Sequence, residues 1–149
     1  QMCIRDRYPA EQPKTIIGAG SNLLIRDGGI SGVVISMKKI NKISKVKEFI
    51  YAECGALDMA ISRMASKLGI SGFEFLIGIP GTIGGALKMN AGSYGSEIKD
   101  ILVNVDVIDG SGSIFNICSK DTFSIPLDKK ITISIDNNED CFLNCVSKA

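Results

Sequence analysis

Glycine is distributed unevenly along this chain of 149 residues, and no other feature of the sequence constrains the fold as strongly. All 16 glycines fall between Gly18 and Gly112, and eight of them lie between Gly69 and Gly95. A glycine inside a helix or strand destabilises it by about 0.5–1 kcal/mol relative to alanine, so a dense cluster needs a reason. The glycines either form the turns of a loop-rich fold or let the backbone approach a ligand closely. Several clusters together favour the ligand.

Histidine is absent, and the 17 basic and 16 acidic side chains leave a net charge of +1. Without imidazole there is no Ser–His–Asp triad, no Cys–His pair and no histidine-ligated zinc, and we predict no metal site. The balanced charge does not attract nucleic acid or an anionic membrane. The longest uncharged apolar stretch, residues 75–87, is shorter than the roughly 20 residues that cross a bilayer. An enzyme of this composition would rely on a cofactor for its chemistry.

Hydrophobic periodicity predicts a mixed α+β domain. Short strands are expected at residues 15–17, 33–36 and 49–53, and the alternating valines of residues 103–107 predict a hairpin with residues 113–117 through a turn at 109–112. The clearest helix covers residues 56–68, followed by Gly69 as a left-handed C-cap. Its apolar face, at helical spacing, comprises Leu57, Ala60, Ile61, Met64, Ala65 and Leu68.

Three glycine clusters contain the candidate binding residues. The first, residues 18–24, directly follows a strand, and its amides could bind an anion. Position 23 is leucine where a Rossmann turn needs glycine, and no G-x-x-x-x-G-K-[ST] loop occurs, so neither common phosphate loop is present. In the second, residues 79–86, Pro80 stiffens a glycine-rich turn. In the third, residues 89–95, the Asn90 amide could bind the edge of a planar heterocycle. For Tyr94, a partly buried aromatic that only packs is as good an explanation as contact with a ligand.

These clusters together resemble one family. The stretches GAGSNLLIRDGGISGVVI (residues 18–35) and GFEFLIGIPGTIGGALKMNAGSYGSEIKDIL (residues 72–102) are similar in content, order and separation to the UDP-N-acetylenolpyruvoylglucosamine reductases (UDP-N-acetylmuramate dehydrogenases, MurB). The resemblance implies an α+β FAD-binding domain of the vanillyl-alcohol-oxidase or PCMH type, not a Rossmann fold. It also implies FAD as the bound cofactor, NADPH as the reductant, and a UDP-sugar substrate for the full-length protein in peptidoglycan precursor synthesis. Nucleic acid, membrane insertion and a protein partner are not expected.

The resemblance also assigns the cofactor-binding residues. The diphosphate-binding turn would comprise Gly18, Gly20, Ser21, Asn22 and Leu23. The segment along the cofactor would comprise Ile79, Pro80, Gly81, Thr82, Gly84 and Gly85. The part of the binding site beside the flavin would be completed by Asn90, Ala91, Gly92, Tyr94 and Gly95.

The resemblance covers residues 15–123, which we expect to form a partial FAD-binding domain. Residues 1–14 and 124–149 match nothing expected there, which indicates an incomplete chain or divergent ends. The family's Tyr-Arg motif, proton-donating serine and glutamate have no counterpart, so we name no catalytic residue and expect the chain alone to be inactive. The alternatives are a non-catalytic flavin- or nucleotide-binding module and a structural glycine-rich domain. The five scattered cysteines favour free thiols in a reducing bacterial cytoplasm.

Overall fold

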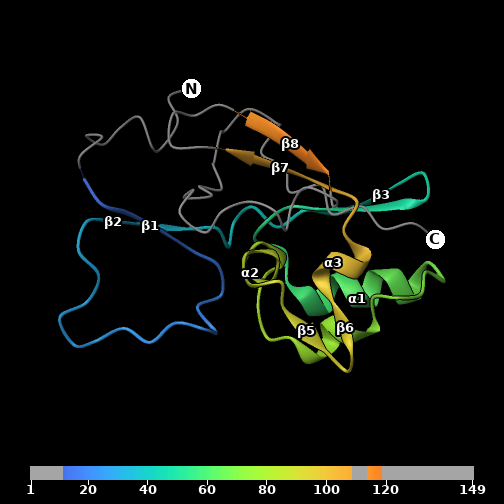
Figure 1. Ribbon diagram of the computed structural model, residues 1–149, viewed down its shortest axis with the longest axis horizontal. Helices are drawn as coiled ribbons and strands as arrows, with labels where there is room; N and C mark the ends of the chain where they lie inside the picture. The colour runs from blue at the N-terminus through green and yellow to red at the C-terminus, as the bar shows by residue number, and fades with distance from the viewer. Residues whose placement is uncertain (1–11, 109–113, 119–149) are drawn as a thin grey trace.

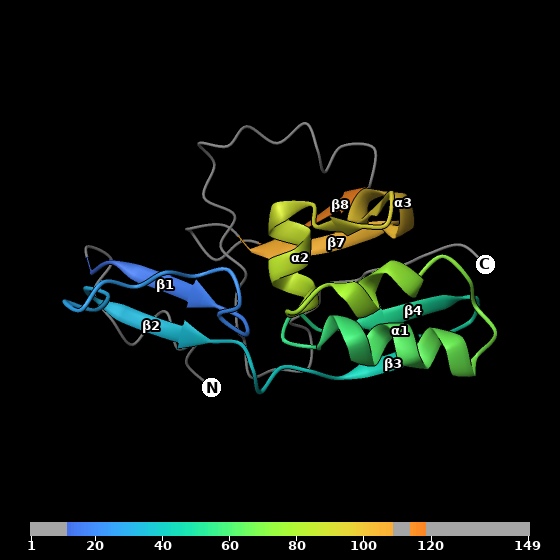
Figure 2. The same ribbon diagram turned by 90° about the horizontal axis from the view of Figure 1, so that it is seen from below.

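The computed structural model describes residues 12–108 and 114–118 of the chain. In Figure 1, β1 and β2 lie with their connecting loop to one side of a body that contains the helices, and Figure 2 shows the same separation from below. The elements in chain order are β1 (Lys14–Ile17), β2 (Val33–Ser36), β3 (Ile43–Val46), β4 (Phe49–Ala52), α1 (Asp58–Lys67), the 3-10 helix η2 (Glu74–Gly78), α2 (Ile83–Met89), β5 (Gly92–Ser93), β6 (Ser96–Glu97), α3 (Ile98–Ile101), β7 (Asn104–Ile108) and β8 (Ile114–Cys118).

The strands of the described residues pair two by two. β1 and β2 are parallel, with Lys14 opposite Val33, so the chain between them must return along their length through the loop of residues 18–32. The pairs β3–β4, β5–β6 and β7–β8 are antiparallel. The predicted strands at 15–17, 33–36 and 49–53 and the predicted hairpin are confirmed within one or two residues. The turn at 109–112 lies outside the described residues.

Helix α1 forms where the sequence predicts it and buries most of the predicted face, with Ala60, Met64 and Leu68 half-buried. Ile61 and Ala65 are buried as expected, whereas Leu57 is 54% exposed and the neighbouring Asp58 is fully buried. The backbone of Leu57 forms an isolated antiparallel bridge with Thr82, just before the helix begins. At the other end of α1, Gly69 has a φ of +68°, which confirms the left-handed residue that ends the helix.

The core is built where α1, η2, α2 and α3 pack together and against β4 and β7. Burying one large aliphatic side chain stabilises a fold by about 1.5–3 kcal/mol, so each of the buried side chains in these layers contributes substantially to stability. None of the helices in the described part of the chain has the length and hydrophobicity that a bilayer crossing needs. The largest fully buried apolar side chains are Ile50, Ile61, Leu76, Ile83, Ile98 and Val105.

Candidate functional site

The first and second glycine clusters, far apart in sequence, lie against each other. Gly18 faces the side chain of Thr82 so closely that a Cβ on Gly18 would lie within 3.0 Å of the Thr82 Oγ1. A Cβ on Gly81 would lie 3.5 Å from the Oγ of Ser21. Thr82 is buried and Ser21 is exposed, so the contact between the two clusters extends from the interior of the protein to its surface. The sequence prediction that these two clusters belong to one site therefore has a geometric basis.

The connection between β4 and α1 holds the second cluster in place. The N–H of Asp58 donates to the carbonyl of Gly81 at 3.3 Å, and the N–H of Ile83 donates to the carbonyl of Ala56 at 2.9 Å. The N–H of Gly84 donates to the carbonyl of Cys54, also at 2.9 Å. These bonds resemble a short strand pairing, so the Gly81 turn is positioned by backbone rather than by side chains.

Helix α2 carries the chain from the second cluster to the third. It ends at Asn90, which has a φ of +45°, and the N–H of Ala91 donates back to the carbonyl of Ala86 at 2.8 Å. The third cluster then packs beside η2, because a Cβ on Gly78 would lie 2.8 Å from the Oγ of Ser93 and 3.2 Å from the ring of Tyr94. The outer part of the Tyr94 side chain remains free, since the residue is 91% exposed. All three clusters thus belong to one continuous part of the described structure.

The glycines of the predicted site fall into two classes. Gly18, Gly84 and Gly92 are in close contact with the chain itself, since a Cβ on any of them would meet protein atoms closer than 3.0 Å. Among the described residues, Gly20 has no atom within 4 Å of its Cβ position, and Gly85 has only the Thr82 Oγ1, at 3.7 Å. Both are exposed. Chain packing therefore explains the first class, whereas the second presents bare backbone that a ligand could approach.

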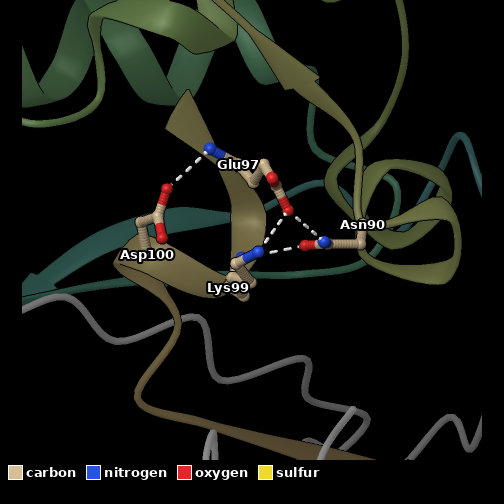
Figure 3. A network of polar contacts seen from close by, with 4 residues as sticks. All are labelled: Asn90, Glu97, Lys99 and Asp100. Atoms are coloured by element: carbon tan, nitrogen blue, oxygen red, sulfur yellow. Dashed lines mark hydrogen bonds and ion pairs between the residues drawn. The ribbon is translucent and has the colours of Figure 1, made fainter. Parts of the chain in front are cut away.

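Asn90 lies in a polar network that ties the end of α2 to β6 and α3 (Figure 3). Its Nδ2 donates to the Oε2 of Glu97 at 2.5 Å, and its Oδ1 accepts from the backbone N–H of Lys99 at 3.1 Å. The Nζ of Lys99 lies 2.8 Å from the same Glu97 oxygen, and the Glu97 N–H donates to Asp100 at 2.8 Å. Hydrogen bonds from Lys99 and then Asn90 lower the pKa of Glu97. The Asn90 amide therefore orients the third cluster, and its predicted contact with a heterocycle stays a prediction.

Asp58 belongs to this region although the sequence analysis did not select it. Its side chain has no exposed surface, and neither carboxyl oxygen has a hydrogen-bond partner among the described residues. A Cβ on Gly81 would lie 3.2 Å from its Oδ2. Burial in protein disfavours the charged form and raises the pKa of the carboxyl from 3.8 to about 7. The only sequence signal was an acidic residue in the first turn of a helix, which is common and points to no site.

The buried Asp58 predicts an unusual dependence of stability on pH. Because its pKa is higher in the folded chain, Asp58 favours folding at low pH and loses this contribution as pH rises through about 7. We expect the stability of Asp58→Asn relative to the wild type to increase by about 2 kcal/mol from pH 5 to pH 8, because asparagine does not titrate. Urea unfolding at both pH values measures this difference. The same difference at pH 5 and pH 8 would contradict the prediction.

Comparison with protein families gives a match over most of the chain. A family model described as FAD binding domain matches residues 2–117. A relative from Paramagnetospirillum magneticum, named UDP-N-acetylenolpyruvoylglucosamine reductase, is 47% identical over 114 residues, which are 76% of this chain and 37% of the relative. One of the same name from Parvibaculum lavamentivorans is 51% identical over 105 residues, 70% of this chain and 34% of the relative. The chain thus spans little more than a third of the length of these relatives.

A solved structure shows the same likeness in three dimensions. The crystal structure of UDP-N-acetylenolpyruvylglucosamine reductase (MurB) from Thermus caldophilus matches with a TM-score of 0.66 at 35% identity. The match covers 74% of this chain and 41% of that one. The family model and this structure confirm the predicted fold class, an α+β FAD-binding domain of the PCMH type, and the predicted family resemblance.

Proposed function

Because the chain belongs to the FAD binding domain family and matches the FAD-binding part of UDP-N-acetylenolpyruvoylglucosamine reductases, we propose that it binds FAD across its three glycine clusters. One observation carries the proposal most directly: Gly18 and Thr82 bring the first two clusters into contact. Around that contact, Gly20 and Gly85 present exposed backbone with no crowding atom. The residues present therefore fit an extended ligand with phosphate groups.

Each cluster supplies a different kind of contact in this proposal. Ser21 and Asn22 are exposed and add a hydroxyl and an amide to the backbone N–H groups of the first turn, which suits a diphosphate. The segment from Ile79 to Gly85 is held from behind by the β4–α1 connection, so its outer face is available to the ligand. Tyr94, with a φ of +52°, sits with Gly95 at the tip of the β5–β6 hairpin and would shield the flavin side.

For the whole protein we propose the reduction of UDP-N-acetylenolpyruvoylglucosamine with NADPH, in peptidoglycan precursor synthesis. Bound FAD would supply the hydride chemistry, which suits a chain without histidine. The described residues would bind and orient the cofactor, and we assign none of them a proton-transfer role. We expect this chain alone to bind FAD without oxidising NADPH in the presence of the UDP-sugar. Turnover by the chain alone would contradict that expectation, and its absence is equally compatible with a non-catalytic flavin-binding module.

Gly85→Ala tests the proposed ligand contact without disturbing the fold. The added Cβ meets only the Thr82 Oγ1, at an ordinary 3.7 Å, and alanine favours the helix that Gly85 belongs to. The variant should be at least as stable as the wild type. If the cofactor lies along this backbone, the methyl group should weaken FAD binding about tenfold or more, which corresponds to about 1.4 kcal/mol.

Quenching of FAD fluorescence during titration measures this affinity, and thermal unfolding measures the stability. Gly28→Ala is the matched control, since Gly28 is exposed, has no positive φ and has no atom of the described chain within 4 Å of its Cβ position. It should bind FAD like the wild type. Wild-type protein that does not bind added FAD would refute the proposed function. Equal affinities of wild type, Gly85→Ala and Gly28→Ala would refute the placement of the cofactor along α2.

A further inference from the structure

The carboxyl group of Asp58 is buried directly behind the proposed cofactor site. Both Asp58 and Ser21 lie close to Gly81, because a Cβ on Gly81 would lie 3.2 Å from the Asp58 Oδ2 and 3.5 Å from the Ser21 Oγ. Asp58 has no exposed surface, whereas Ser21 is exposed. Asp58 is therefore unable to contact a ligand directly, but it adjoins the two turns that would hold one.

An ionised carboxylate without partners is unstable in such a place. Neither oxygen of Asp58 accepts a hydrogen bond from any described residue, and burying an unpaired charge is costly. Burial in the protein is the cause of the raised pKa of Asp58. The titratable side chains on the elements packed against Asp58 are Tyr51 on β4, Glu53 and Cys54 in the β4–α1 connection, Arg63 and Lys67 on α1, and Glu74 in η2. The loop that contains Ser21 adds Arg26 and Asp27.

We infer that Asp58, buried beside Ser21 and Gly81 without a partner in the described chain, must be neutral when the diphosphate of FAD binds at these turns, so that binding of FAD takes up a proton at Asp58. This inference rests on the proposed FAD binding. The diphosphate of FAD brings negative charge to the Ser21 turn, and that charge acts on Asp58 through protein of low dielectric constant. A protonated Asp58 tolerates the charge, whereas an ionised Asp58 repels it. Asp58 acts through its charge and does not touch the cofactor.

The measurable consequence is a pH-dependent affinity for FAD. In the wild type, FAD should bind tightly at pH 6, where Asp58 holds its proton, and about tenfold or more weakly at pH 8.5, where the proton must first be taken from solvent. FAD carries the same charge throughout this range. In Asp58→Asn the side chain keeps its shape and stays neutral. Its affinity should match the wild type at pH 6 within about threefold and should stay constant up to pH 8.5.

The experiment is titration of the full chain with FAD, followed by flavin fluorescence at pH values from 6 to 8.5. Asp27→Asn is the matched control, because it removes one negative charge from an exposed position in the same loop as Ser21. It should keep the pH dependence of the wild type. A purely structural role of Asp58 would lower the affinity of Asp58→Asn equally at every pH and leave its slope unchanged. That result would overturn the inference.

Calorimetry of the wild type gives an answer that does not depend on any variant folding. Titration with FAD in two buffers of different ionisation enthalpy reports the protons taken up, which should be roughly one per FAD at pH 8 and almost none at pH 5.5. Binding without proton uptake at pH 8, or a wild-type affinity that does not vary with pH, would refute the role of Asp58 and leave the proposed function intact. Wild-type protein that does not bind FAD even at pH 6 would refute the proposed function itself.

Discussion

Replacing Gly55 by alanine is expected to remove a large part of the stability of the chain. Gly55 is buried between β4 and α1, and a Cβ on it would lie 2.5 Å from the carbonyl oxygen of Ile40 and closer still to that of Met37. Both obstacles are backbone atoms. The Gly55 N–H also donates to the Ile40 carbonyl at 2.8 Å, so the two segments cannot move apart without losing this bond. We expect a loss of about 3 kcal/mol or more, against the 5–15 kcal/mol that is typical of a whole domain.

Urea unfolding of Gly55→Ala beside Gly28→Ala measures this effect. Both variants add one methyl group to a glycine, but Gly28 is exposed and nothing lies within 4 Å of its Cβ position. The control should stay within about 0.5 kcal/mol of the wild type. If the two variants unfold at the same urea concentration, the close packing at Gly55 does not exist in solution.

Local patterns in the sequence were sufficient for most of the strands and for α1, because each of these elements has its own hydrophobic period. Helix α2 was not predicted. Gly84 and Gly85 lie in its first turn, and glycine weakens a helix by about 1 kcal/mol relative to alanine. What holds α2 is contact with distant residues: Gly84 packs against Cys54 and donates to its carbonyl. Helix propensity depends on local sequence alone, so it does not predict a helix that is held by such a contact.

The buried face of α1 was predicted wrongly in part for a similar reason. Apolarity favoured Leu57 for the core, but Leu57 bridges Thr82 through its backbone and is exposed, whereas Asp58 is buried. A hydrophobic pattern predicts that a carboxylate is exposed, so it could not identify Asp58 as a core residue. The exchange of an apolar residue for an acid at this position is a local violation of the folding rules, and such violations concentrate at functional sites.

The candidate site was predictable in its composition but not in the roles of its residues. The sequence singles out the three glycine clusters, and the structure brings them together. Spacing alone does not distinguish Gly18, which is packed against Thr82, from Gly20, which faces open space. That difference depends on residues more than 60 positions away. The cofactor contacts assigned to single residues therefore stay predictions, although the clusters that contain them lie next to one another.

Gly18→Ala should separate the first two clusters and weaken FAD binding about tenfold or more. The new Cβ would lie within 3.0 Å of the Thr82 Oγ1, and Thr82 is buried, so its hydroxyl must leave its place or the turn must move outward. Overpacking of this kind typically lowers stability by about 1–3 kcal/mol. The turn that contains Ser21 would shift with Gly18, and the amides of the two clusters would no longer face one ligand.

Thr82→Ala provides the decisive comparison, because it removes the obstructing oxygen. The Cβ of Thr82 lies 3.4 Å from the position of the new Cβ on Gly18, so the double variant Gly18→Ala/Thr82→Ala has room for both methyl groups. It should recover most of the stability and of the FAD affinity that Gly18→Ala loses. The double-mutant cycle should show a coupling of about 1 kcal/mol or more, as residues in contact do. Additive effects of the two substitutions would mean that Gly18 and Thr82 do not meet, and the site would then not be a single surface.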